Sequence, residues 1–247
     1  MHLHLPKPLH GWRAFAGEVG IIVIGVLIAL GAQQLVGNLH WRSEVRETDD
    51  RLRQEVVGDL TNAYERFAID PCLRPRLAEL RDQLLKAGPE WRGSQAQFAN
   101  DVYQSGFPSV YRTPNRPWMQ SSWRTALGGE TLDHFNAQRV QQFSTLHDSI
   151  EMLDQTQAEE VQAAATLGDL AFAGPISAAD RRADLKTVAK LDGLDARILY
   201  LAHLLFHEAG EAGIRADPEA IRQQIAQQRD YRGACVRGPA LSSLGSR

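Results

Sequence analysis

Hydrophobic and polar positions follow two different patterns along this chain. Residues 19–32 read VGIIVIGVLIALGA, an unbroken run of apolar or small residues. Beyond Trp41, apolar residues recur every three or four positions among arginines and glutamates, which is the spacing of an amphipathic helix. The pattern therefore predicts one wholly apolar segment near the N-terminus and a series of amphipathic helices after it.

The apolar segment is long enough to cross a membrane. With its flanks it runs from Trp12 to Leu35, and these 24 residues span about 36 Å as an α-helix. The hydrocarbon core of a bilayer is about 30 Å thick. Trp12 and Trp41 bracket the segment, as aromatic residues do at membrane–water interfaces. We predict a leader and a single transmembrane helix over residues 1–40, with the lipid bilayer as the first partner.

Two other interpretations of this segment stay open. A cleaved secretory signal would have its small-residue site at residues 29–32, ALGA, although the leader is long and the acidic Glu18 adjoins the apolar core. A buried core helix is the other alternative, and the lack of a polar face argues against it.

Small residues and one acid lie within the predicted span. Ala16 with Gly20, and Gly25 with Ala29, form pairs four residues apart that let two membrane helices approach closely. They predict a homo-oligomer or a membrane protein partner, although small residues are common in any membrane helix. Glu18 is an intramembrane acid by position, and such a group is either functional or reaches the aqueous interface.

The remainder of the chain predicts helices and no convincing strand. Gly37 and Asn38 are the sole breakers before the first of them, so it can continue the membrane helix. Asp70-Pro71 fits an N-cap followed by proline at the first helical position, so a new helix is expected there. A capping pair, Ser177 with Asp180, marks another start. The predicted helices cover residues 41–69, 70–87, 118–127, 136–172, 177–191, 195–212 and 217–232.

The fold class that follows is all-α: an N-terminal transmembrane helix followed by an irregular antiparallel helical bundle over residues 41–236. Residues 88–118 are rich in glycine and proline and are expected to be irregular, with room for a short helix over 94–103. The Ser/Gly-rich residues 237–247 are expected to form a disordered tail.

Two cysteines give the sharpest structural hypothesis. Cys72 lies at the start of one predicted helix and Cys235 just after the last. A disulfide between them would clip the C-terminal segment to the bundle, and it requires an oxidising compartment such as the periplasm. The alternative is two unrelated cysteines.

The sequence contains signals for both orientations of the span, with the bundle in the cytoplasm or in the periplasm. Four arginines, at positions 42, 46, 51 and 53, follow the apolar segment, and the positive-inside rule would place them in the cytoplasm. A long domain is translocated largely regardless of flanking charge, however, and the cysteine hypothesis favours the periplasm. We therefore expect a periplasmic bundle anchored in a bacterial inner membrane.

Composition and motifs limit the chemistry. The chain has 247 residues, a net charge of −3 and an ordinary globular composition. It lacks the overall positive charge that is typical of nucleic-acid-binding proteins, so we predict no nucleic-acid partner. Phosphate-binding glycine loops and the nucleophile elbow of hydrolases are absent from the sequence. We therefore predict no enzyme activity, no cofactor and no metal.

Two weaker features could carry chemistry. His203 and His207 share a helix face near Glu208 and Glu211, but no third ligand follows from the spacing, so a solvated or inter-helix histidine pair is favoured over a metal site. Aromatic residues and arginines crowd residues 90–124 and either line a groove for a ligand or pack over the bundle. They are Trp91, Tyr103, Phe107, Tyr111, Arg112, Arg116, Trp118, Trp123 and Arg124.

The N-terminal residues also carry a family resemblance. Residues 17–30, GEVGIIVIGVLIAL, followed by Gln33 and Gln34, resemble the Gly-Glu and Ile-Gly-Val-Leu-Ile-Ala-Leu anchor motif of an uncharacterised family of bacterial single-pass membrane proteins, a domain of unknown function. The leader over residues 5–13 resembles an α-proteobacterial branch of that family, and residues 123–132 resemble a later Trp-x-x-Ala element. The resemblance implies a membrane anchor and no catalytic residues.

These inferences together predict a membrane-anchored helical interaction or scaffold protein. An extracytoplasmic ligand-sensing bundle that acts through a partner subunit is the alternative.

Overall fold

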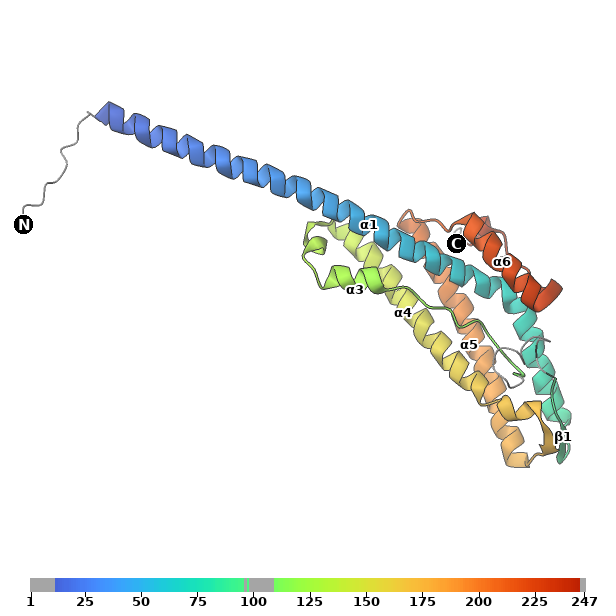
Figure 1. Ribbon diagram of the computed structural model, residues 1–247. Coiled ribbons are helices and arrows are strands. Elements are labelled where there is room, and N and C mark those ends of the chain that lie inside the picture. The colour runs from blue at the N-terminus through green and yellow to red at the C-terminus, as the bar shows by residue number, and fades with distance from the viewer. Residues whose placement is uncertain (1–11, 96, 98–108, 245–247) are drawn as a thin grey trace, which may run out of the picture.

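One long helix dominates the structure. The computed structural model describes residues 12–95, 97 and 109–244. Helix α1 (Trp12–Lys86) is continuous over 75 residues. Its first part projects as an isolated rod, and its second part enters a bundle of helices (Figure 1). The fold is all-α, a long N-terminal helix followed by a helical bundle, as the sequence pattern predicted.

The bundle forms around the second part of α1. Helix α4 packs along α5, and both α5 and α6 pack along α1. The core between them is mainly apolar, with Leu52, Leu60, Leu80, Phe143 and Leu153 all fully or almost fully buried. The elements beyond α1 are β1 (Glu90–Arg92), α3 (Ser121–Leu127), η1 (Thr131–His134), α4 (Ala137–Ala165), η2 (Gly168–Ala171), β2 (Ala173–Pro175), α5 (Ala178–Glu211), α6 (Pro218–Arg232), η3 (Gly233–Cys235) and η4 (Leu241–Ser243).

Local sequence signals explain where three helices begin. The helices predicted to start at Asn136, Ser177 and Asp217 each do so, and each of these side chains accepts a hydrogen bond from a backbone N–H in the first turn. Such an N-cap satisfies one of the N–H groups that have no partner within the helix.

The predicted helix boundary at Asp70-Pro71 is wrong. Pro71 and Pro75 both lie inside α1, which bends along this stretch but does not end (Figure 1). A proline inside a helix removes a hydrogen bond and crowds the preceding turn. Tertiary packing compensates here, because Leu73 and Leu77 after the bend are buried. The N–H of Arg237 also donates a hydrogen bond of 2.8 Å to the backbone carbonyl of Ala68 in this stretch.

Two further predictions about helices need correction. The helices expected over residues 177–191 and 195–212 are one helix, α5, and the exposed Gly193 lies in its interior. Buried neighbours such as Leu191 and Leu194 outweigh the cost of one glycine, about 1 kcal/mol relative to alanine. The helix expected to reach residue 172 ends at Ala165.

The prediction of no strands is also wrong, on a small scale. β1 and β2 pair antiparallel, with Trp91 opposite Gly174. Each strand has three residues, too few to show the alternating pattern by which a strand is recognised in a sequence. This pair fastens the end of α1 to the connection between α4 and α5.

The C-terminal residues 237–244, which we predicted to be part of a disordered tail, form the short helix η4 and make specific contacts with the bundle. The hydroxyl group of Tyr64 donates a hydrogen bond of 2.6 Å to the carbonyl oxygen of Pro239, and Leu244 is buried. Burial of a few apolar side chains against α1 outweighs the Ser/Gly-rich composition. Residues 245–247 lie outside the described residues, as do residues 1–11 of the leader.

The rod of α1 has the properties of a membrane span. By length and composition it is the one described helix that could cross a membrane, and none of its apolar window is buried. The ring of Trp41, which we predicted to lie at the membrane–water interface, stacks on His134 of η1 with the centroids 3.9 Å apart. The bundle therefore begins within a few residues of the apolar segment.

Candidate functional site

The two cysteines form the predicted disulfide. The bond joins Cys72, in the bent part of α1, to Cys235 in η3, and their Cα atoms are 5.2 Å apart. This separation is ordinary for a disulfide. The bond fastens the C-terminal segment to α1 and closes a loop that contains most of the bundle.

The predicted membrane residues lie on the projecting rod. Ala16, Glu18 and Ala29 are exposed, and a Cβ atom added at Gly20 or Gly25 would meet nothing within 4 Å. Successive residues of an α-helix are rotated by about 100°, so the two small-residue pairs, nine positions apart, lie on opposite sides of α1. A single helix–helix interface could therefore use one pair and not both.

The histidine pair of α5 is spread over separate contacts. The ring of His203 packs against Phe67, and Nε2 of His207 lies 3.6 Å from Glu211. Glu208 instead accepts a hydrogen bond of 2.7 Å from the hydroxyl group of Ser149. Among the described residues, no group of three or more His, Cys, Asp or Glu side chains could hold a metal ion.

A buried ion cluster lies at the centre of the bundle. The guanidinium group of Arg66 in α1 donates two hydrogen bonds to Glu160 of α4, at 3.0 and 2.7 Å, and one to Asp195 of α5, at 3.0 Å. All three side chains are almost completely buried. Burial raises the pKa of Asp195 to about 7. The guanidinium group of Arg66 opposes this shift, and the neighbouring carboxylate of Glu160 adds to it. The cluster ties together the three helices that form the core.

A second buried polar cluster lies closer to the projecting rod of α1. Asp59 of α1 accepts a hydrogen bond of 3.0 Å from the backbone of Met119, and burial raises its pKa to about 8. His147 of α4 stacks on Trp123, and burial lowers the pKa of this histidine to about 4 despite the nearby carboxylate of Glu55. Neither ring nitrogen of His147 has a hydrogen-bond partner within the described residues.

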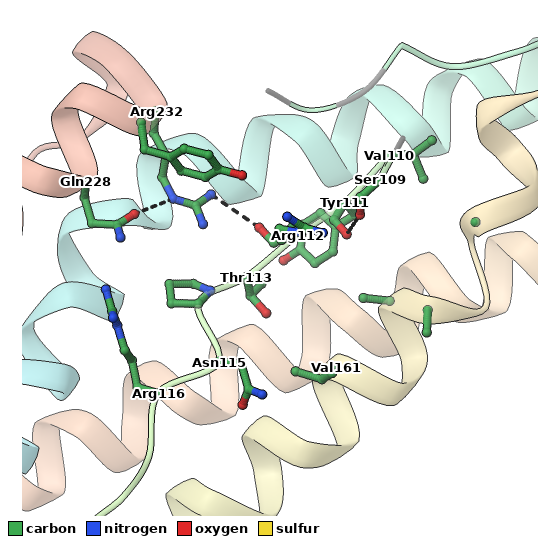
Figure 2. Close-up of a pocket in the computed structure, with 15 residues that line it drawn as sticks. Ser109, Val110, Tyr111, Arg112, Thr113, Asn115, Arg116, Val161, Gln228 and Arg232 are labelled. Atoms are coloured by element: carbon green, nitrogen blue, oxygen red, sulfur yellow. Dashed lines mark hydrogen bonds between the residues drawn. The ribbon is translucent and has the colours of Figure 1, made fainter. Parts of the chain in front are cut away.

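A cavity of about 830 Å³ lies between the connection over residues 109–116, α4 and α6. Figure 2 shows Arg232 and Gln228 of α6 on one side, the extended connection across it, and Val161 of α4 opposite. Its charged lining residues are all arginines: Arg112, Arg116 and Arg232.

Hydrogen bonds position two of these arginines. Arg116 donates two hydrogen bonds, of 2.9 and 2.8 Å, to the buried carboxylate of Glu65 in α1. Arg232 donates one of 2.7 Å to the side chain of Gln228 and one of 3.3 Å to the backbone carbonyl of Arg112. Such contacts restrict the arginine side chains, so the lining is largely ordered before any ligand enters.

The aromatic-rich stretch over residues 90–124 takes both of the roles that we left open, because part of it lines a cavity and part of it packs over the bundle. Tyr111, Arg112 and Arg116 line the cavity, whereas Trp118 and Trp123 are buried against the bundle. Trp91 is also buried, and Arg124 belongs to α3. Tyr103 and Phe107 lie outside the described residues.

Sequence reasoning missed the two buried polar clusters, although a signal was present. Glu160 lies on the apolar stripe of α4, seven residues after Leu153, and Asp195 lies on that of α5, three residues before Ile198. Asp59 and Arg66 likewise occupy the stripe of α1. A charged residue at a core-facing position predicts a buried partner, but the pattern cannot name that partner.

Comparison with known proteins adds no assignment. No family model, no curated protein and no solved structure matches this chain. The resemblance of the N-terminal residues to bacterial membrane anchors therefore remains a prediction from the sequence.

Proposed function

We propose that this protein is a single-pass membrane protein that holds a helical bundle at the membrane surface and acts as an interaction or scaffold protein. The continuity of α1 is the observation that carries the proposal. One helix of 75 residues supplies both the exposed apolar rod and a central element of the bundle. The bundle is thus joined to the span without a flexible linker and keeps a defined distance from the bilayer.

We place the bundle outside the cytoplasm, on the periplasmic side of a bacterial inner membrane. The disulfide between Cys72 and Cys235 supports this placement, because disulfides persist in oxidising compartments and are rare in the cytosol. The bacterial source is what the N-terminal resemblance implies.

Trapping of thiols in intact cells tests the compartment. Cells are treated with an alkylating reagent that adds mass, and the denatured protein is compared on a gel with and without prior reduction. We expect the two native thiols to react only after reduction. In the variant Cys235→Ser the thiol of Cys72 has lost its partner, so one thiol should react without reductant. Free reaction of both native thiols would instead place the bundle in the cytoplasm.

Extraction and mass separate an anchor from a cleaved signal. An uncleaved span keeps the 27.5 kDa chain in the membrane pellet after alkaline carbonate washing. Cleavage after residue 32 would remove the apolar segment and release a shorter chain into the soluble fraction. That result would refute the anchor and leave the bundle intact.

Crosslinking tests the interaction role. A photoreactive amino acid is placed at Tyr200, which is exposed on α5, or at Leu27 within the rod. We expect reproducible protein crosslinks from the bundle position, from the rod position, or from both. If neither position yields a protein crosslink in native membranes, the proposed interaction role is contradicted.

A ligand-sensing bundle is the second candidate function, and the arginine-lined cavity is the observation that favours it. A ligand held between α4, α6 and the 109–116 connection would contact elements that pack on α1. Such binding could be conveyed to the span because α1 is continuous. An output through another subunit is part of this proposal.

A further inference from the structure

We infer that the cavity between residues 109–116, α4 and α6 is a binding site for a small organic anion, one that carries a carboxylate or phosphate group on an apolar body. The inference rests on the second candidate function and names its ligand class. It does not require the membrane anchor to be correct.

The shape of the cavity suits a small molecule. Its volume of about 830 Å³ falls in the range of small-molecule sites, roughly 300–1,000 Å³. Two of its walls are helices, and the third is the connection fixed at Arg116 by Glu65 and at Arg112 by Arg232. The site is thus formed between the packed helices and a connection that hydrogen bonds hold against them.

The charge of the lining selects an anion. Arg112, Arg116 and Arg232 are the lining residues with a formal charge, and no aspartate or glutamate is among the described lining residues. Guanidinium groups keep their charge at any physiological pH and match the planar geometry of carboxylate and phosphate groups. The charge of Arg116 is already paired with the buried carboxylate of Glu65, so Arg112 and Arg232 are the main source of positive potential toward an anion.

The connection that crosses the cavity is anchored on its other side. The side chain of Tyr111 is buried and interacts with the ion cluster of Arg66, Glu160 and Asp195 rather than with the space of the cavity. Figure 2 shows Tyr111 and Thr113 on this connection.

The opposite wall favours an apolar body in the ligand. Val161, Ala164 and Ala165 of α4 line this side, together with Pro114 from the connection. An inorganic ion alone would leave this surface without contacts, whereas an aromatic or short aliphatic group would cover it. The combination of arginines on one side and small apolar residues on the other defines the ligand class.

Calorimetric titration of the full chain in detergent micelles tests the site. The probes are isophthalate, phenyl phosphate and the neutral isophthalamide. We expect at least one anion to bind with a Kd below about 1 mM at low salt, and the neutral amide to bind at least about tenfold more weakly. Isophthalate alone would indicate a carboxylate ligand, and phenyl phosphate alone a phosphate ligand.

Matched variants locate the binding. Ala165 is exposed at the cavity, so Ala165→Trp fills the space without disturbing the core. Ala158→Trp, at an exposed position of α4 outside the cavity lining, is its control. Ala165→Trp and Arg112→Gln should each weaken binding at least about tenfold, and Ala158→Trp should not.

The result that overturns the inference is equally specific. If neither anion binds, or if binding is unchanged in both Ala165→Trp and Arg112→Gln, the cavity is not an anion site. A circular dichroism melt of each variant shows whether the bundle is folded. Loss of binding in a folded protein that still sediments with membranes would leave the proposed anchor unaffected.

Discussion

The two parts of α1 differ in how far their apolar side chains are exposed. In the rod, Ile21 is 75% exposed and Leu27 is 62% exposed, whereas Leu60 in the bundle is 1% exposed. Both parts belong to one uninterrupted helix. The backbone geometry is therefore shared, and the difference lies in what surrounds the apolar side chains.

This comparison shows why the rod is a candidate membrane span. The bundle part of α1 carries an apolar stripe that α4, α5 and α6 cover, while the rod is apolar on every side and no described element covers it. Exposed apolar surface of that extent usually marks an interaction with membrane or protein. The polar clusters of Arg66 and Asp59 occur only in the covered part, where neighbouring helices supply their partners.

Removing the disulfide should give the largest difference between the two parts. In the native protein the bond joins residues that are 163 positions apart in the sequence. In the double variant Cys72→Ser, Cys235→Ser this loop is open, so the unfolded bundle gains conformational entropy. The chain-entropy model gives a loss of about 4–5 kcal/mol in the free energy of unfolding. Chemical denaturation in detergent measures it, and membrane retention of the rod should not change. An unchanged midpoint would show that the bond does not constrain the chain.

A pair of matched leucine substitutions compares the two environments directly. Leu60→Ala removes buried methyl groups from the core and should lower the free energy of unfolding of the bundle by about 2–5 kcal/mol. Leu27→Ala makes the same chemical change on the exposed rod and should leave bundle unfolding unaltered. Equal losses from both variants would mean that the rod is packed against protein.

The pH dependence of stability should come from the bundle. Because burial raises the pKa of Asp59 to about 8, the folded state binds a proton that the unfolded state releases near pH 4. The contribution of Asp59 to the free energy of unfolding is therefore largest at low pH, and it falls as the pH rises from about 4 toward 8. His147, with its pKa lowered to about 4, acts oppositely, since its contribution is lost as pH falls from about 6.5 to 4.

Above pH 6.5 the histidine contribution is complete, so the carboxylate effect can be isolated. Between pH 6.5 and 8 the free energy of unfolding should fall by about 1–2 kcal/mol, partly through Asp195. Asp59→Asn should remove most of this slope, and Asp230→Asn, at an exposed site, should not. Urea unfolding at several pH values measures it. A slope that persists in Asp59→Asn would exclude Asp59 as its source.

Self-association of the rod is the smallest expected effect. Gly25→Leu and Gly20→Leu enlarge opposite sides of α1, so one of them should weaken a dimer several-fold while the other serves as its control. Crosslinking yield in lipid nanodiscs or native membranes measures the effect. If both variants crosslink as the native chain does, neither small-residue pair forms an interface.

Much of the fold was predictable because it depends on local signals. The N-caps at Asn136, Ser177 and Asp217 place three helix starts within a residue, since capping involves only neighbouring backbone groups. The cavity was only partly foreseeable. The crowding of Tyr111, Arg112 and Arg116 was visible in the sequence, but α4 and Arg232 of α6 complete the site from distant positions.

The apolar segment and the all-α class could be derived from the sequence alone, because they rest on composition and periodicity. The pairing of Cys72 with Cys235 was one of two alternatives, and the folded structure selects it. Packing between distant residues fixed the other features. It carried α1 through Pro71 and Pro75, it gave Arg66 its two carboxylates, and it packed residues 237–244 against α1. The physical reason is that burial and buried charge pairing join residues far apart in the chain, and their free energies outweigh local preferences of about 1–3 kcal/mol.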